Sequence, residues 1–171
     1  HILFGLHHLA GPHMDMFMTW FTTMINTIWL WAILAAGGLW KRQSRWVTIS
    51  IIVAVFLAIL VGDVAIKHVV MRIRPYLVIP DAPTLATLKY PISYSFPSGH
   101  SFFFFAGATV LFRFHRRLGM AAYGLACVVA FSRMYLFMHF PSDVFTGAAL
   151  GILIGNIAWK MCGYAKNRLS Y

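Results

Sequence analysis

Five apolar stretches, each close to the length that crosses a lipid bilayer, constrain this chain more than any other feature of its sequence. They cover about 17–40, 47–70, 98–112, 118–138 and 144–162. A helix needs about 20 apolar residues for this, because it rises about 1.5 Å per residue through a hydrocarbon layer about 30 Å thick. The 171 residues are 60% hydrophobic and only 11% charged, which is typical of membrane proteins. The sequence therefore predicts an all-α, polytopic transmembrane bundle of about five spanning helices.

The segments outside these stretches are short, with one exception. Residues 1–16 mix apolar side chains with histidines and are too short to span a membrane, so we expect an interfacial helix there. Residues 71–97 form the one long connection and contain five of the seven prolines. A connection of this length is usually functional or disordered. No repeat and no second domain are visible, so we predict a single membrane-embedded domain over 1–171.

The positive charge of the chain is unevenly distributed. A net charge of +10 would suggest nucleic-acid binding in a soluble protein. Here, however, nine of the 14 basic residues lie between the first and second stretches, between the third and fourth, or at and beyond the end of the fifth, all on one predicted side of the membrane. They are Lys41, Arg42, Arg45, Arg113, Arg116, Arg117, Lys160, Lys166 and Arg168. The positive-inside rule makes that side cytoplasmic. We therefore predict a multi-pass membrane protein with its C-terminus inside, the 71–97 loop outside and no nucleic-acid partner.

Charged and acid/base side chains gather at the outer ends of the predicted helices. Antiparallel order brings the end of the second and fourth stretches to the same depth as the start of the third and fifth. The residues at that depth are Lys67, Arg74, Ser98, Gly99, His100, Arg133, His139 and Asp143. Charges near membrane helices are costly and usually functional. Three cations, two histidines and a carboxylate together predict an anion site with acid/base capability.

Two local patterns strengthen this interpretation, although each has a plainer alternative. The amides of Ser98, Gly99 and His100 begin an apolar helix, and helix starts bind phosphate, but alone they would be an ordinary helix start. His139 and Asp143 are four residues apart, which suits a carboxylate that orients an imidazole or a simple interfacial ion pair. A metal site at His100, His139 and Asp143 is disfavoured, because the neighbouring cations would repel a metal ion.

Other polar and small residues leave alternatives open. Asp63 lies one turn before Lys67 and either pairs with it or faces water. Arg72 and Lys89 are solvated charges or contacts for lipid head groups. Three glycines at four-residue spacing, Gly147, Gly151 and Gly155, form a small-residue face that indicates packing inside the bundle or a homodimer interface.

Three motifs in the chain resemble the signatures of one enzyme family. They are Lys67-His-Val-Val-Met-Arg-Ile-Arg74-Pro75, then Pro97-Ser98-Gly99-His100, then Ser132-Arg133 with His139 and Asp143. Their order and spacing are similar to those of the type 2 phosphatidic acid phosphatase superfamily, in its branch of bacterial membrane lipid phosphatases. The resemblance runs from the second apolar stretch to the end of the chain. It implies an integral membrane enzyme of a bacterial cytoplasmic (inner) membrane that hydrolyses lipid phosphates or diphosphates at the outer face.

The resemblance also implies roles for individual residues, with no metal or other cofactor. His139 would attack phosphorus and form a phosphohistidine, Asp143 would orient it, and His100 would protonate the leaving group and then activate water. The phosphate-binding set would be Lys67, Arg74, Ser98, Gly99 and Arg133.

The substrate is less specified than the chemistry. The site opens beside apolar helices, so a phosphate on a hydrocarbon tail is the expected partner. The first choice is undecaprenyl diphosphate, with phosphatidylglycerophosphate, phosphatidate and lipid A as alternatives. A transporter or a non-catalytic lipid-binding protein is the alternative from another class. Transporters commonly have internal repeats, and none is visible here.

Overall fold

The computed structural model describes residues 2–7, 11–25, 45–80, 82–83 and 93–169. Every element in that part of the chain is helical. The elements are α1 (Ile2–His7), α2 (Pro12–Ile25), α4 (Arg45–Ala58), the π-helical η1 (Ile59–Ile66), α5 (Lys67–Val70), α6 (Pro75–Val78), α7 (Gly99–Phe114), α8 (Arg116–Tyr135) and α9 (Pro141–Leu169). The all-α prediction is confirmed, and no strand occurs in the described residues.

Three of the described helical runs are long and apolar enough to cross a membrane. They are Arg45–Val78, Arg116–Tyr135 and Pro141–Ala165. The predicted second, fourth and fifth stretches fall within or overlap these runs. The predicted third stretch corresponds to α7, which has 16 residues and is mostly buried among its neighbours. Most of the first stretch, 17–40, lies outside the described residues.

Several helix boundaries differ from the predicted ones for local reasons. The N-terminal part contains two helices, and α2 begins at Pro12 and continues past the predicted boundary at residue 16. Proline suits the first turn of a helix because its fixed φ is already helical and its missing N–H would be unpaired there. The fourth helix ends at Tyr135 rather than 138, because Phe137 has a φ of 55° that a continuing α-helix does not allow.

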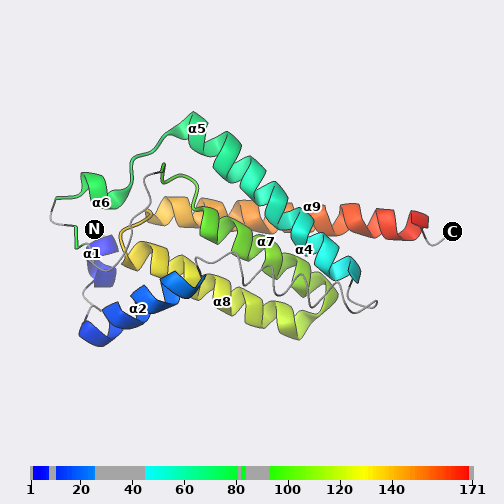
Figure 1. The fold of residues 1–171 in the computed structure, drawn as a ribbon, viewed down its shortest axis with the longest axis horizontal. Coiled ribbons are helices and arrows are strands. Elements are labelled where there is room, and N and C mark those ends of the chain that lie inside the picture. The colour runs from blue at the N-terminus through cyan, green and yellow to red at the C-terminus, as the bar shows by residue number, and fades with distance from the viewer. Residues whose placement is uncertain (1, 8–10, 26–44, 81, 84–92, 170–171) are drawn as a thin grey trace.

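The centre of the bundle is α7, which packs against α4, α8 and α9 (Figure 1). Phe102, Ala106 and Val110 of α7 are fully buried in a cluster with alanines of α4 and α9. Small side chains on the neighbouring helices let the backbones approach closely, as is usual for membrane bundles.

The glycine face of α9 is the clearest case of this close packing. A Cβ atom on Gly151 would lie 2.4 Å from the carbonyl oxygen of Phe102, and one on Gly155 would lie 2.6 Å from that of Ala106. Gly147 meets the start of α7 in the same way. The three glycines therefore serve packing inside the chain. The homodimer interface through them, the other alternative, stays a prediction.

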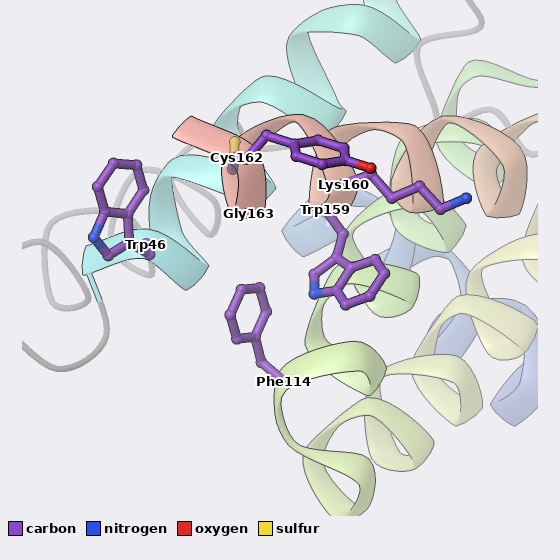
Figure 2. Close-up of a pocket in the computed structure, with 7 residues that line it drawn as sticks. Trp46, Phe114, Trp159, Lys160, Cys162 and Gly163 are labelled. Carbon is purple, nitrogen blue, oxygen red and sulfur yellow. The ribbon is translucent and has the colours of Figure 1, made fainter. Parts of the chain in front are cut away.

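The two ends of the bundle differ in chemistry. One end collects the end of α5 and the starts of α7 and α9, and the other collects the end of α7 and the far part of α9 (Figure 1). A cavity of about 460 Å³ lies at this second end, lined by Trp46, Phe114, Trp159, Lys160, Cys162, Gly163 and Tyr164 (Figure 2). Its described lining is mostly aromatic and contains no histidine or carboxylate, whereas the motif histidines lie at the first end.

Candidate active site

A smaller, polar cavity of about 170 Å³ lies at the end of the bundle where α7 and α9 begin. Its lining residues are Asp63, Lys67, Arg74, Ser93, Gly99, His100, Phe103, Arg133, Met138 and His139. Six of the eight site residues predicted from the sequence are in this lining. The two histidines therefore share one cavity, as the depth argument requires.

The other two predicted residues, Ser98 and Asp143, are fully buried behind the lining. Ser98 is the N-cap of α7, and its hydroxyl oxygen accepts hydrogen bonds from the amide and the hydroxyl of Ser101. Its own amide donates to the carbonyl of Asp143 at 3.0 Å. Ser98 thus joins the start of α7 to α9, and its contact with phosphate stays a prediction.

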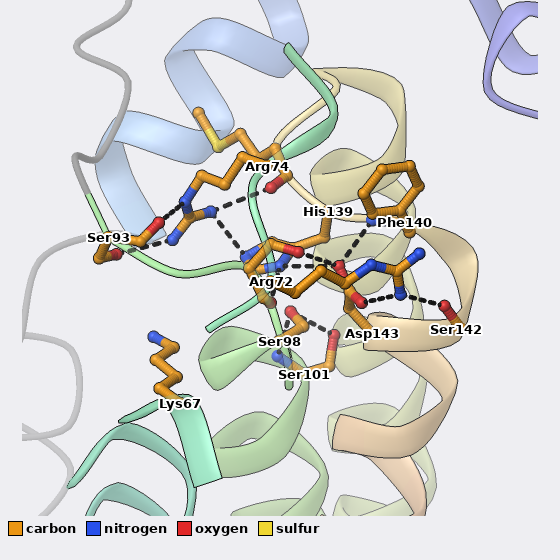
Figure 3. Close-up of polar contacts among 12 residues, drawn as sticks. Lys67, Arg72, Arg74, Ser93, Ser98, Ser101, His139, Phe140, Ser142 and Asp143 are labelled. Carbon is orange, nitrogen blue, oxygen red and sulfur yellow. Dashed lines mark hydrogen bonds and ion pairs between the residues drawn. The ribbon is translucent and has the colours of Figure 1, made fainter. Parts of the chain in front are cut away.

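His139 is buried in the connection between α8 and α9, and its two ring nitrogens face different partners (Figure 3). Nδ1 lies 2.7 Å from the carbonyl oxygen of Ser95, and Nε2 lies 3.2 Å from Nη1 of Arg74. A carbonyl can only accept and a guanidinium can only donate, so Nδ1 carries the proton and Nε2 carries the lone pair. Burial lowers the pKa of His139 from 6.5 to about 4. The imidazole is therefore neutral at neutral pH.

Asp143 is less directly tied to His139 than the spacing suggested. Its nearest approach to Nδ1 of His139 is 3.7 Å. The carboxylate instead accepts hydrogen bonds from the Ser95 hydroxyl at 2.6 Å, the Phe140 amide at 2.9 Å and Nη1 of Arg72 at 2.8 Å. Ser95 therefore mediates between the acid and the imidazole. Sequence reasoning missed Ser95, because it belongs to none of the three motifs.

The buried arginines differ in how their donors are used. Arg74 donates to the carbonyl and hydroxyl of Ser93 and to the carbonyl of Met138, so its position is fixed. Arg133 is 2% exposed, and its Nε and Nη2 atoms have no hydrogen-bond partner within the described part of the chain. Buried donors without partners are rare and need an explanation. A cavity that receives an anion supplies one.

Lys67 and Asp63 form an ion pair on the other side of the cavity. Asp63 belongs to η1, where the wider π-helical winding changes the register of the residues before Lys67. The start of α7 approaches this pair closely, since a Cβ on Gly99 would lie 3.0 Å from Oδ1 of Asp63. Asp63 is thus both the partner of Lys67 and a wall of the cavity.

His100 lines the cavity from the first turn of α7 and contacts the ring of Phe103, with 5.1 Å between centroids. The side chains considered as a metal-ligand set, His100, His139 and Asp143, do not converge, because the carboxylate turns toward Arg72 and Ser95. Within the described residues no three His, Cys, Asp or Glu side chains are placed to hold a metal ion. The arrangement instead offers a neutral imidazole lone pair and several cationic donors to a small anion.

A family model described as the PAP2 superfamily matches residues 46–167 of the chain. The chain belongs to the PAP2 superfamily. The match begins with α4 and includes every residue that lines the polar cavity.

Named relatives of this PAP2 chain include enzymes of polyprenyl lipids. It is 31% identical to an undecaprenyl-diphosphatase of Sulfolobus acidocaldarius over 124 residues, which cover 72% of this chain and 59% of that protein. It is 36% identical to a decaprenylphosphoryl-5-phosphoribose phosphatase of Mycobacterium tuberculosis over 139 residues, covering 77% and 70%. The chain thus spans about three fifths of the length of the first of these relatives.

A solved structure shares the fold over nearly the whole chain. The crystal structure of LpxE from Aquifex aeolicus superposes with a TM-score of 0.79 and 26% identity, covering 93% of both chains. The membrane PAP2 fold is therefore shared over the described bundle.

Proposed function

We propose that this PAP2 protein hydrolyses lipid phosphates through a phosphohistidine at His139. The observation that carries the proposal is the neutral, buried imidazole whose Nε2 lone pair faces a cavity containing the unpartnered donors of Arg133. A neutral imidazole is a nucleophile, and the arginine donors suit the oxygens of a phosphoryl group.

In the first step, Nε2 of His139 attacks phosphorus and the bond from phosphorus to the lipid oxygen breaks. The bound phosphate anion favours the protonated form of His100, and the imidazolium gives its proton to that oxygen, so the lipid leaves as an alcohol or, from a diphosphate, as a monophosphate. Arg74 donates to Nε2 before the attack, at 3.2 Å. As the new N–P bond forms, Nη1 of Arg74 keeps its hydrogen bond to the Met138 carbonyl, and its other N–H donates to a phosphoryl oxygen in place of Nε2.

In the second step, neutral His100 takes a proton from water while the water oxygen attacks the phosphohistidine. The N–P bond breaks, inorganic phosphate leaves, and His139 recovers its lone pair. His100 finishes protonated and ready for the next lipid. The protons and electron pairs balance over the cycle, with water as the only co-reactant.

The charge on the transferring phosphoryl group is stabilised by Lys67, Arg74 and Arg133, with the amide of Gly99 at the start of α7. Preorganised donors of this kind provide a large part of enzymatic rate enhancement. The cavity volume of about 170 Å³ suits the phosphoryl group alone. The hydrocarbon tail then remains outside, against the apolar surface of the bundle.

We propose undecaprenyl diphosphate as the substrate. The names of the Sulfolobus and Mycobacterium relatives support a polyprenyl tail. Phosphatidylglycerophosphate, phosphatidate and lipid A are the alternatives, since the reacting group is the same in each. A transporter or a non-catalytic lipid-binding protein would not need a nucleophile aligned with a leaving-group acid.

The proposed orientation in the membrane rests on the positions of the basic residues. The basic residues Arg113, Arg116 and Arg117 lie where α7 ends and α8 begins, at the end of the bundle away from the polar cavity. We propose that this end is cytoplasmic in a bacterial inner membrane, so the site is extracytoplasmic. Labelling of single cysteines introduced at Val78 and Arg117 with a membrane-impermeant reagent in intact cells tests this. Labelling at position 117 and not at position 78 would show that the protein has the opposite orientation.

The function is tested by phosphate release from a panel of the four lipids by purified protein in chelator. Wild type is expected to be active, and His139→Gln is expected to lose activity by at least about a thousandfold, the scale of removing a nucleophile. His13→Gln, an exposed histidine in α2, is the matched control and is expected to behave as wild type. Full activity of His139→Gln would refute the assignment of the nucleophile.

A further inference from the structure

Arg72 is a charged residue beside the site that lies within the first motif but not at one of its signature positions, which are Lys67, Arg74 and Pro75. It comes from the linker between α5 and α6, and its Nη1 donates to Oδ1 of Asp143 at 2.8 Å and to the hydroxyl of Ser142 at 2.7 Å. Its guanidinium also lies 3.9 Å from the centroid of the Phe140 ring (Figure 3). The side chain is thus fixed to the start of α9 by an ion pair, a hydrogen bond and a cation–π contact.

A continuous path of hydrogen bonds leads from Arg72 to His139. The amide of Ser95 donates to the carbonyl of Arg72 at 2.8 Å, and the Ser95 hydroxyl donates to Oδ2 of Asp143. The carbonyl of the same Ser95 accepts from Nδ1 of His139 at 2.7 Å. Arg72 therefore contacts both groups that surround the imidazole, without touching the imidazole or lining the polar cavity.

We infer that Arg72 is a positioning residue that holds the Asp143 carboxylate in place, so that Nδ1 of His139 donates to the Ser95 carbonyl and Nε2 keeps its lone pair. Oδ2 of Asp143 is already 3.7 Å from Nδ1 of His139. Without the cation on its other oxygen, the carboxylate gains from turning toward the imidazole and stabilising its protonated form. A protonated His139 has no lone pair with which to attack.

This inference rests on the proposed role of His139 and concerns how the chain keeps that role available. It differs from a purely structural role, in which Arg72 would only join the linker after α5 to α9. A structural fastener alters the amount of folded protein. A positioning residue also alters the pH at which the folded protein becomes active.

The pH dependence is interpretable because the other groups around His139 stay in place. Arg74 and Asp143 face the ring directly. Asp63, Lys67, His100 and Arg133 line the cavity from η1, α5, α7 and α8. Apart from the Asp143 carboxylate, whose movement is the proposed effect, none of these groups is replaced or loses a hydrogen bond to Arg72 when Arg72 is substituted, and the substrate phosphate titrates equally in every variant. A difference between two pH profiles therefore reports the contribution of Arg72.

The experiment compares Arg72→Met and Arg72→Lys with wild type on one lipid phosphate, with activity expressed per folded, monodisperse protein. Arg113→Met is the matched control, because Arg113 also hydrogen bonds a polar side chain, Asn156, and lies over an aromatic ring, Trp159, but at the other end of the bundle. In Arg72→Met we expect kcat to fall about tenfold, since a hydrogen bond to a charged group is lost from a pair that is partly screened by solvent. KM is expected to change less than about twofold, because the substrate contacts remain.

The acid limb of the pH profile gives the decisive readout. Burial keeps the pKa of His139 near 4, and the neutral form present above that pKa is the reactive one. Freeing the carboxylate raises this pKa, so the acid limb moves to higher pH in Arg72→Met. Arg72→Lys keeps a charge near Asp143 and is expected to recover most of kcat and the wild-type limb.

The outcomes separate the two proposals. If wild type releases no phosphate, the proposed function fails. If wild type is active, the function stands. The positioning role is overturned if the acid limb of Arg72→Met is unchanged and its kcat per folded protein is no lower than that of Arg113→Met. A fall in kcat that Arg72→Lys does not relieve, with no shift of the limb, also overturns it.

Discussion

Replacing Arg133 with methionine should make this protein more stable and inactive at the same time. Arg133 is almost fully buried, and two of its donor atoms, Nε and Nη2, have no partner in the described structure. Its one recorded hydrogen bond runs from Nη1 to the sulfur of Met138 at 3.5 Å, which is a weak interaction. The desolvated cation therefore destabilises the folded protein, and a bound anion would offset this destabilisation.

The size of the effect follows from those unpaired donors. An unsatisfied buried donor costs about 1–3 kcal/mol, and replacing a buried charge with an apolar side chain of similar volume is often stabilising by about 1–4 kcal/mol. Methionine keeps the volume and removes the charge, so we expect Arg133→Met to gain about 2 kcal/mol. The same change removes a phosphoryl contact, so activity should fall by about 10²–10³.

The assay is thermal unfolding of purified protein in detergent, with and without vanadate as a phosphate mimic. Vanadate should stabilise wild type, because a ligand present at about 100 times its Kd adds about 2.7 kcal/mol. It should have little effect on Arg133→Met. A variant that is less stable than wild type by 1 kcal/mol or more, and that still responds fully to vanadate, would show that Arg133 is a structural residue and refute the reasoning.

Two further predictions concern packing and pH. Gly151→Ala should destabilise the bundle by about 1–3 kcal/mol in thermal unfolding, because its Cβ would lie 2.4 Å from the Phe102 carbonyl oxygen. Gly124→Ala is the control, and it should be neutral or slightly stabilising because there is open space around Gly124. Equal stability of the two variants would contradict the packing. The pKa of His139 is about 4 in the folded protein and about 6.5 when unfolded, so the unfolded state binds more protons between these pH values. The free energy of unfolding should therefore fall by about 3 kcal/mol from pH 6.5 to 4, and this fall should be absent from His139→Gln. Parallel pH profiles of stability for the two proteins would contradict the lowered pKa.

Much of the site was predictable from the depth of residues in a bundle. Hydrophobic length and antiparallel order were enough to bring Lys67, His100 and His139 to the same end, and the structure has all three around one cavity. This works because a membrane fixes the vertical position of each helix end. The hydrophobic pattern gives no comparable information about the direction in which each side chain points within the plane of the membrane.

What the sequence did not predict depends on loop conformation. Ser95 and Arg72 approach Asp143 only because residues 71–74 and 93–98 run side by side, with the Ser95 amide bonded to the Arg72 carbonyl. Asp143 lies 3.7 Å from His139 and also accepts a hydrogen bond from Ser95 in a neighbouring loop, and Ser98 bonds to Ser101 in the first turn of α7. No periodicity encodes such pairings between irregular segments.

The most direct test of the central claim is to trap the covalent intermediate. A lipid labelled with ³²P in the terminal phosphoryl group is mixed with excess enzyme, quenched in alkali within one turnover, and the labelled peptide is sequenced. We predict alkali-stable, acid-labile label on His139 and none in His139→Gln. Label on any other residue, or a turnover-competent enzyme that never acquires label, would contradict the account.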